Sequence, residues 1–358
     1  MSLKHRLKLG LREGYARLLF HTGLHRVVDR LMPRRMTILF GHCVEDDSVN
    51  GFLPRDMTMR EETLRRVLSW FGRRGYVLTN VGAGMSALDA GTSGPSLVAL
   101  SMDDGYKDNR TRLLPVLSEL GASATVFLES RPLDERRVNW THKLHWIVRD
   151  GGEEACARAY VERCRVEADR RTALASLEGP GERLLYRFKR VLKYEVDTGE
   201  RDRVVDELFR EAGGDERALC DALYMDWDDA RALRDGGVEL GGHTVNHVIL
   251  SRLGPDDART EIGHCRDRMV AELGPAAGRT FAYPFGRRWD YDQNSMQAAR
   301  DVGFELAVNT HAGVNRPSDD RLQLRRLPVD DRTPLHLLVA EACGGFELLR
   351  RVGLELGE

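Results

Sequence analysis

The chain has 358 residues, which is enough for one large domain or two ordinary ones. Hydrophobic residues make up 42% of the sequence and charged residues 31%, so a globular protein with a substantial core is expected. The formal net charge is -2, which argues against a nucleic-acid-binding protein, because such proteins carry an excess of Lys and Arg.

No stretch of about 18 apolar residues is present, so the sequence predicts no membrane-spanning helix. The basic N-terminus also lacks the continuous apolar core and the cleavage site of a secretory signal. The six cysteines are scattered without a CxxC pair, which favours free buried thiols over a thiolate zinc cluster. We therefore expect a cytoplasmic protein, either free or peripheral to the inner face of the membrane.

Residues 1–35 are predicted to form one or two amphipathic helices with leucines set among Lys and Arg. Residues 1–36 hold nine Lys and Arg against two acids, Glu13 and Asp29. Two interpretations follow: the segment packs on the main domain, or it lies on an anionic membrane surface. The apolar positions are Leu7, Leu11, Leu18, Leu19 and Leu24.

Short apolar runs alternate with helical patterns along most of the remaining chain. Strands are predicted at 36–40, 97–102, 124–128, 238–240, 280–283 and 306–309. Helices are predicted at 57–75, 110–120, 228–234, 255–273 and 294–302. Thr58 is the expected N-cap of the first of these helices, and 85–95 is an expected loop. Such βαβ alternation is typical of a parallel sheet covered by helices.

Residues 131–225 break this alternation. They show helical periodicity without a convincing strand, interrupted at Gly179-Pro180-Gly181. We expect a helical insertion that covers or extends the cleft and shapes the choice of substrate. The predicted domains are a helical segment at 1–35, an α/β domain at 36–130 and 226–335, the insertion at 131–225 and a C-terminal helix at 336–358.

Polar residues with chemical potential follow the predicted strands, and catalytic groups of parallel α/β folds lie at the carboxyl ends of strands. Asp103-Asp104-Gly105 follows one strand, where one carboxylate can bind a metal while the other acts as a base; an acidic turn is the alternative. His243 and His247 follow another strand, and imidazoles four residues apart share one face of a helical turn.

One Asp and two His together form a ligand set that leaves coordination positions open for water and substrate. Such a set favours a divalent metal ion. Zn²⁺ is the default expectation, and Co²⁺, Ni²⁺ or Fe²⁺ would accept the same ligands.

Further candidates lie near the same strand ends. The segment Phe281-Ala282-Tyr283-Pro284-Phe285-Gly286 is expected to place aromatic walls at a pocket rim, with the Phe285 N–H able to hold an oxyanion, or it is an ordinary strand and turn. Individual candidates, each with a structural alternative, are His42 at the rim, His311 as a general acid, Arg326 as a partner for a carboxylate, and Trp289 and Tyr291 as surfaces for a sugar ring.

Three of these segments resemble the motifs of the polysaccharide deacetylase family, also called the NodB homology domain or carbohydrate esterase family 4. Ser101-Met102-Asp103-Asp104-Gly105-Tyr106 is similar to its first motif, His243-Thr244-Val245-Asn246-His247 to its second, and Phe281 to Gly286 to its third, in the same order. The segments 40–44 and 324–329 faintly resemble opening and closing motifs of one branch. The resemblance covers about 36–130 and 226–330.

The resemblance implies an α/β fold, a distorted (β/α)7-type barrel, and an enzyme that removes N-acetyl groups from carbohydrates. It implies that Asp104, His243 and His247 bind the metal and that Asp103 is the general base for the attacking water. It also implies that Phe285 helps to hold the oxyanion. Carbohydrate is then the expected substrate, with no nucleic acid as partner.

Two positions depart from the family pattern. An Arg that supports the base often opens the third motif, and here that position is Ala282, so Arg326 is expected to substitute from a different strand. The usual Leu-x-His motif of the general acid has no clear counterpart, which leaves His311 or, less suitably, His336. Two other functions stay open: hydrolysis of a non-sugar amide or cyclic imide, and glycan binding without catalysis.

Overall fold

The computed structural model describes residues 3–91, 93–165, 174, 177, 184–351 and 353–354. The chain divides into two units. The barrel unit comprises Met1–Glu45, Arg55–Ser130 and Met225–Glu358, and the helical unit comprises Asp46–Pro54 and Arg131–Tyr224. The helical unit therefore overlaps the expected insertion and adds a short stretch from earlier in the chain. The predicted break at Gly179-Pro180-Gly181 lies outside the described residues.

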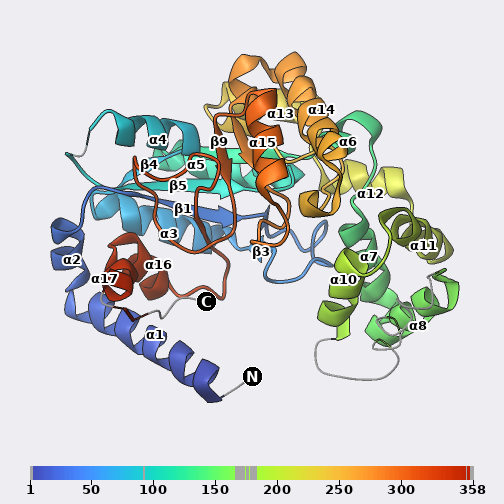
Figure 1. Ribbon diagram of the computed structural model, residues 1–358, viewed down its shortest axis with the longest axis horizontal. Coiled ribbons are helices and arrows are strands. Elements are labelled where there is room, and N and C mark those ends of the chain that lie inside the picture. Colours follow the sequence, from blue (N-terminus) through green and yellow to red (C-terminus); the bar gives the residue numbers. More distant parts are fainter. Residues whose placement is uncertain are drawn as a thin grey trace. The chain divides into compact units, whose positions relative to one another are not determined.

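All the paired strands of the barrel unit run parallel (Figure 1). The hydrogen-bonded order is β10-β1-β5-β6-β7-β8-β9, and β4 also pairs with β5. The strands are β1 (Met36–Gly41), β4 (Val77–Thr79), β5 (Leu97–Met102), β6 (Ala124–Leu128), β7 (Glu239–Gly242), β8 (Thr280–Ala282), β9 (Leu306–Val308) and β10 (Arg326–Pro328).

The two ends of this sheet nearly meet. Val308 at the end of β9 forms a parallel bridge with Leu324, two residues before β10. The N–H of Asn309 donates to the Leu324 carbonyl at 2.9 Å, and the N–H of Leu324 donates to Ala307 at 2.9 Å. The sheet is thus a nearly closed parallel barrel, a distorted (β/α)7 architecture, and the predicted fold class is confirmed.

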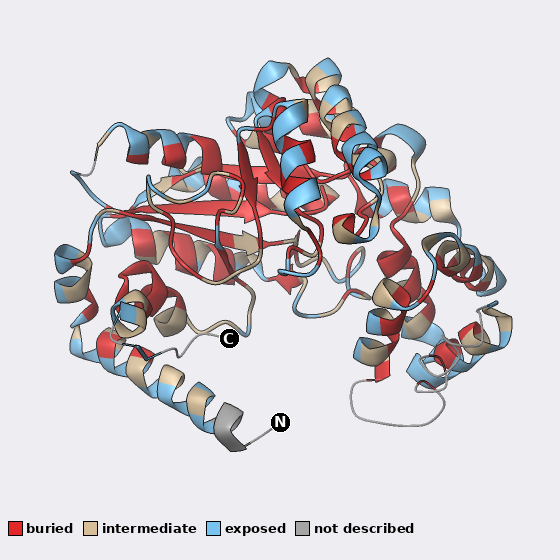
Figure 2. Ribbon diagram, in the orientation of Figure 1, coloured by how far each residue is buried: buried red, intermediate tan, exposed pale blue. Residues whose placement is uncertain are grey.

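The central strands are buried on both faces, as Figure 2 shows by their red colour, whereas Val77 of β4 is exposed. Every residue of β5 and β6 is buried, which explains why parallel strands appear in the sequence as unbroken apolar runs. One core cluster combines residues from five strands with residues of α4 (Val81–Asp89). Its strand members include Met36, Ile38, Leu97, Ala99, Phe127, Ala282 and Val308.

Helices lie between the strands, with some shifts from the prediction. Helix α3 (Glu61–Arg73) begins later than expected, because Thr58–Met59 forms a strand, β3, that pairs with β2 (Cys43–Val44); Thr58 is therefore not the N-cap. Part of the expected loop at 85–95 is helix α4, which begins after Asn80, whose side chain accepts from the Ala83 N–H at 2.8 Å.

The remaining helices of the barrel unit match the predicted segments to within a few residues. The helix expected at 110–120 begins as a π-helix at Asn109–Leu113 and continues as α5 (Leu114–Leu120). The others are α13 (Trp227–Asp235), α14 (Pro255–Leu273) and α15 (Gln293–Val302), with short 3-10 turns at Leu250–Arg252 and Pro275–Gly278.

The two ends of the chain pack on each other. Helices α1 (Leu3–Thr22) and α2 (His25–Leu31) precede the barrel, and the expected C-terminal helix is divided into α16 (Leu335–Ala342) and α17 (Gly345–Arg351). Ala16 and Leu19 of α1 share a buried cluster with Ala340, Cys343 and Phe346. One of the two interpretations of residues 1–35, packing on the main domain, therefore holds for this face of α1.

The helical unit buries a charged lysine among apolar side chains. Lys143 is buried and lies 2.6 Å from Asp206 and 2.7 Å from Glu216, so its charge is paired twice. Its helices include α7 (Trp140–Gly151), α8 (Glu153–Arg163), α10 (Leu184–Tyr194), α11 (Thr198–Glu211) and α12 (Glu216–Leu223), preceded by α6 (Ser130–Glu135).

Among the described residues, no helix has the length and apolar character needed to cross a membrane.

Candidate metal centre

Asp103 and Asp104 follow the last residue of β5, where the strand ends in a sharp turn. Asp104 and Gly105 both have positive φ, 74° and 76°. A Cβ on Gly105 would lie 2.8 Å from the Leu128 side chain, so glycine is required there both by conformation and by space. The turn sends the two adjacent carboxylates in different directions and keeps both buried.

His243 and His247 lie on a loop after β7 and not on a helical turn, which corrects the expected basis of their proximity. Thr244 and His247 have φ of 65° and 50°, so the loop winds through left-handed conformations. Just before this loop, a Cβ on Gly241 would lie 2.5 Å from Thr280 Oγ1 and 2.7 Å from Phe127, so the strand can pass there only as glycine.

A carboxylate from α14 holds this loop. Glu261 Oε2 accepts from the N–H groups of Val245 and Asn246 at 3.1 and 3.0 Å, and Oε1 accepts from the Asn246 amide at 2.6 Å. These are the residues between the two histidines. Sequence inspection gave Glu261 no role, because only the fold brings it to the loop.

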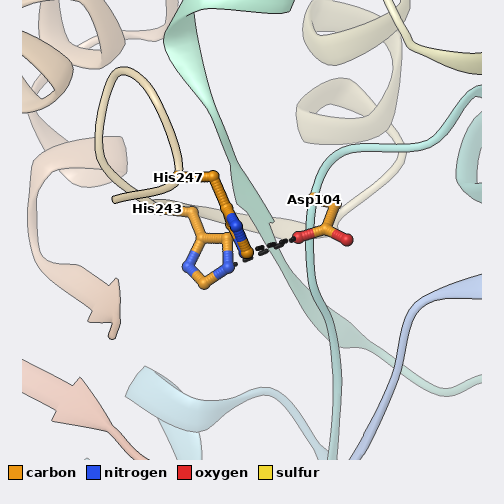
Figure 3. A group of neighbouring side chains, drawn as sticks. All are labelled: Asp104, His243 and His247. Carbon is orange, nitrogen blue, oxygen red and sulfur yellow. Dashed lines mark ion pairs between the residues drawn. The ribbon is translucent and has the colours of Figure 1, made fainter. Parts of the chain in front are cut away.

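The two loops bring three ligand atoms together (Figure 3). Asp104 Oδ1 lies 3.4 Å from His243 Nε2 and 3.4 Å from His247 Nε2. The candidate ligand atoms of the three residues all lie within 4.8 Å of one another, and all three residues are buried. The opposite side of the His243 ring is fixed, since Nδ1 lies 2.7 Å from the Ala282 carbonyl oxygen, which directs Nε2 to Asp104.

Two properties of this group fit a divalent metal ion. Asp104 Oδ1 is buried yet has no hydrogen-bond partner among the described residues, and two imidazole nitrogens face it. Burial would raise the pKa of Asp104, but contact with His243 and the charges of His247 and His42 outweigh burial and hold the pKa well below its usual value. The carboxylate is therefore ionised, as a metal ligand must be.

Tyr106 fixes the other oxygen of Asp104. Its hydroxyl donates to Oδ2 at 3.1 Å, and the Tyr106 side chain is fully buried. Oδ1 is thereby left to face the histidines. Tyr106 belongs to the first sequence motif, two residues after Asp104, and this adjacency was the signal that it contributes to the site.

Asp103 forms a bidentate ion pair with Arg326 of β10. The two guanidinium nitrogens donate at 2.7 and 2.8 Å to the two carboxylate oxygens. Burial would raise the pKa of Asp103, but the Arg326 charge outweighs burial and lowers it. The guanidinium carbon lies 4.5 Å from the Phe40 ring centroid, and Nε donates to the Asn309 carbonyl at 2.8 Å, so Arg326 is itself held rigidly.

The turn Pro284-Phe285-Gly286 borders the histidines. Phe285 has φ of 61°, and its ring centroid lies 4.5 Å from that of His247. Thr310 fixes the turn, because its hydroxyl donates to the Phe285 carbonyl at 3.1 Å and its N–H donates to Gly286 at 3.0 Å. Four of the five described non-glycine residues with positive φ are at this centre: Asp104, Thr244, His247 and Phe285.

The aromatic candidates around the turn do not form the expected wall. Tyr283 is fully buried in a core cluster with Phe281, and its ring stacks on Tyr291 with centroids 4.2 Å apart, so both tyrosines are core residues. Trp289 is 55% exposed, with the Arg287 guanidinium 5.9 Å from its ring centroid. The exposed ring of Trp289 can therefore contact a ligand, whereas the buried side chain of Tyr283 cannot.

The three other candidate histidines are placed differently. His42 follows Gly41, whose carbonyl accepts from the Asp103 N–H at 3.0 Å, and its electrostatic interaction lowers the pKa of both Asp103 and Asp104. The backbone carbonyl of His311 accepts from the Arg326 N–H at 3.0 Å. Burial and the charges of Arg325 and Arg288 lower the pKa of the His311 ring. His336 binds Glu13 at 2.6 Å, which excludes it as the acid of this centre.

Comparison with known proteins agrees with this picture. Residues 201–307 match the model of a family described as polysaccharide deacetylase. The putative polysaccharide deacetylase YxkH of Bacillus subtilis (strain 168) is 21% identical over 106 residues, which is 30% of this chain and 37% of the relative. The alignment thus spans little more than a third of that relative.

Several solved structures share the fold. The Streptococcus pyogenes deacetylase PplD in complex with acetate matches 87% of this chain and 99% of its own, with 16% identity and a TM-score of 0.57. IcaB from Ammonifex degensii matches 87% and 97%, with 14% identity and a TM-score of 0.55. A de-N-acetylase from Aggregatibacter actinomycetemcomitans matches 85% and 98%, with 15% identity and a TM-score of 0.54.

The family match covers the second and the third motif, and Asp104 of the first motif lies beside the second in the folded barrel. The sequence resemblance is therefore confirmed over this segment: residues 201–307 match the polysaccharide deacetylase family, and the solved structures share the fold.

Proposed function

We propose that the chain is a metal-dependent hydrolase that removes N-acetyl groups from an amino-sugar glycan or glycan precursor. The observation that carries this proposal is the meeting of Asp104, His243 and His247 next to the Asp103–Arg326 pair. One carboxylate is placed among imidazoles as a ligand, and its neighbour in the chain is held separately as a base. The match of residues 201–307 to the polysaccharide deacetylase family supports the same chemistry.

Asp104, His243 and His247 would hold the ion, with Zn²⁺ as the first expectation for one carboxylate and two imidazoles and Co²⁺, Ni²⁺ or Fe²⁺ as alternatives. When bound, such an ion supplies a Lewis acid that polarises a carbonyl and makes water more acidic. Hydrogen bonds on the far side of two of these residues support this role, since the Ala282 carbonyl fixes the His243 ring and the Tyr106 hydroxyl fixes the Asp104 carboxylate.

Asp103 is proposed as the general base. Arg326 occupies one lone-pair direction on each carboxylate oxygen, and each oxygen keeps another with which to accept a proton from water. The hydroxyl adds to the acetyl carbon, the C–N bond breaks, and the nitrogen takes a proton to leave as an amine with acetate as the second product. Arg326 keeps Asp103 ionised and aimed during this sequence.

Two further contributions complete the proposed reaction. The N–H of Phe285, in its left-handed turn beside His247, is assigned to the oxyanion that forms on the acetyl oxygen. Protonation of the amine is assigned to a histidine, with His311 as the sequence-based choice and His42 as the second candidate, because His42 directly follows Gly41, which contacts Asp103 through the backbone. Pro284 shapes the turn, and Trp289 offers an exposed ring to a sugar.

The proposed substrate is a biosynthetic glycan or precursor in a reducing compartment such as the cytoplasm. The six free cysteines support that compartment, because five of them are buried thiols without a disulfide. Acetate release should therefore be measured on N-acetylhexosamine oligomers and on nucleotide- and lipid-linked N-acetylamino sugars. Activity restricted to small amides or cyclic imides would indicate a hydrolase with a non-sugar substrate. Binding of the glycans without acetate release would indicate a non-catalytic glycan-binding protein.

The decisive experiment separates metal binding from turnover. Asp103→Asn should retain the metal, measured by elemental analysis after gel filtration, and abolish acetate release. Asp104→Asn should lose the metal as well. Normal turnover of Asp103→Asn would refute its role as base, and full metal content in Asp104→Asn would refute the ligand assignment.

A further inference from the structure

Exposed apolar side chains gather on the N-terminal helices. Seven of the twelve exposed large hydrophobic side chains in the described part of the chain lie between residues 7 and 31, and Leu31 is 79% and Leu7 64% exposed. Single exposed leucines are ordinary on a protein surface, but a concentration within one short segment indicates an interaction surface. Figure 2 shows the same segment, α1 and α2, mostly in pale blue and tan.

Helix α1 has two apolar sides, although one would suffice to dock it on the barrel unit. Ala16 and Leu19 face the buried cluster with α16 and α17. Leu7, Leu11 and Leu18, spaced by four and seven residues, fall on a different side of the helix and are exposed. The packing of α1 on the barrel unit therefore accounts for only half of its apolar residues.

Helix α2 continues the pattern. Leu24, Val27 and Leu31 are spaced by three and four residues, so they share one side of the helix, and all are exposed. We name six of these seven exposed side chains, all but Leu9, the N-terminal apolar face; its members are Leu7, Leu11, Leu18, Leu24, Val27 and Leu31.

The charges around this face are basic. Residues 7–35 hold seven Lys and Arg, of which Arg35 is buried, and two acids, in a chain whose net charge is -2. Both acids are already paired, Glu13 with Arg17 and His336, and Asp29 with Arg35. Arg26 and Arg30 are exposed and form no ion pair with any described residue.

We propose that the N-terminal apolar face docks on an anionic lipid bilayer. Leucines at this spacing enter the boundary between headgroups and acyl chains, while the arginines beside them reach the lipid phosphates. A second copy of the chain fits less well, because it would bring the same basic surface into contact with itself. The contact is peripheral and independent of the deacetylase assignment.

The test is flotation of the full-length protein with vesicles. Vesicles of phosphatidylcholine alone are compared with vesicles of phosphatidylcholine and phosphatidylglycerol in equal parts. The protein should float with the anionic vesicles, remain unbound with the neutral ones, and be released by salt. The double variant Arg26→Glu/Arg30→Glu should weaken partitioning of the protein onto the anionic vesicles at least about twentyfold. Each positive charge removed should cost about fivefold, and the two negative charges added should weaken binding further. Leu11→Ser/Leu18→Ser should weaken it at least about tenfold.

The controls change exposed arginines and an exposed apolar side chain on other helices. Arg66→Glu/Arg158→Glu changes the net charge by the same amount, and Tyr186→Ser removes an exposed apolar side chain from α10. Both should float like the wild type, and circular dichroism should show all variants folded. Absence of flotation by the wild type, or equal losses in the controls, would overturn the proposal. So would a leucine-dependent dimer in solution without vesicle binding, which would assign the face to a second copy.

Discussion

Arg326 binds both carboxylate oxygens of Asp103 across 223 positions of the sequence. Strands β10 and β5 are not neighbours, since β1 lies between them, so the arginine reaches its partner past the end of β1. Arg326 also donates to Ser101 Oγ at 3.2 Å, and Ser101 lies on β5 two residues before Asp103. The position that carries the supporting arginine in much of the family is Ala282 on β8 here, and the charge is supplied from a different strand, β10.

Arg326→Lys should therefore lower acetate release by about 10–100-fold while the bound metal is retained. Lysine keeps the positive charge but forms only a point contact, so Asp103 loses its fixed orientation. Arg326→Met should be more severe, because it leaves a buried carboxylate unpaired. Turnover at saturating substrate and metal content per chain are the measurements. Wild-type turnover in Arg326→Lys would show that bidentate geometry is not needed.

The sequence predicted the parallel barrel because its central strands are buried on both faces and appear as apolar runs. It did not predict the short strands β2, β3, β4 and β10, since strands of two or three residues are specified by their partners more than by their own composition. Helix α4 was missed for a related reason: its Gly, Ser and Ala residues suggest a loop, and the burial of Val81, Met85 and Leu88 makes it a helix.

The three candidate ligand residues could be named from the sequence, and the residues that hold them in place could not. His243 and His247 were paired by their spacing, yet left-handed loop conformations and not a helical turn bring them together. The prediction of Tyr283 at the pocket rim is wrong, because side chains alternate along a strand and Tyr283 shares its face with Phe281. Its N–H donates to Val308 at 3.2 Å as an extension of β8, and its side chain turns into the core beside Phe281.

Glu261 is the clearest residue that only the fold reveals, and Glu261→Ala should weaken metal binding about 10–100-fold. Without its carboxylate, two N–H groups between the histidines lose their acceptor and the strained loop relaxes. The affinity is measured by competition with a chelator, and turnover with excess metal should recover most of the loss. Asp257→Ala, an exposed acid on the same helix, is the control and should bind metal normally.

Tyr106→Phe tests the orientation of Asp104. Removing the hydroxyl that donates to Oδ2 frees the carboxylate to rotate, so metal affinity should fall by up to about tenfold. Tyr283→Phe is a matched control, because its buried hydroxyl has no hydrogen-bond partner among the described residues and lies in the core. Equal chelator sensitivity in the two variants would show that the contact with Asp104 does not position the ligand.

His42→Asn and His311→Asn together identify the group that protonates the leaving amine. The variant that lacks the acid should lose about 100-fold or more in turnover of an N-acetyl substrate and much less with an aryl acetate, whose phenolate leaves without a proton. Loss of both activities to the same extent would indicate a structural role. Burial and two arginines lower the pKa of His311, so fewer His311 rings carry a proton at neutral pH.

Glu239 couples the stability of the barrel to pH. Burial raises the pKa of this carboxyl on β7, against hydrogen bonds from Thr125 Oγ1 at 2.6 Å and the Gly82 N–H at 3.0 Å. A raised folded-state pKa means that its stabilising contribution is complete below the unfolded pKa of about 4.3 and is lost as pH rises through the folded-state value. Glu239→Gln removes this titration. Relative to Glu239→Gln, the wild type should thus be more stable at acidic pH than at neutral pH, as followed by urea unfolding across that interval. A difference between the two proteins that stays constant with pH would show that Glu239 is not buried as a titrating group.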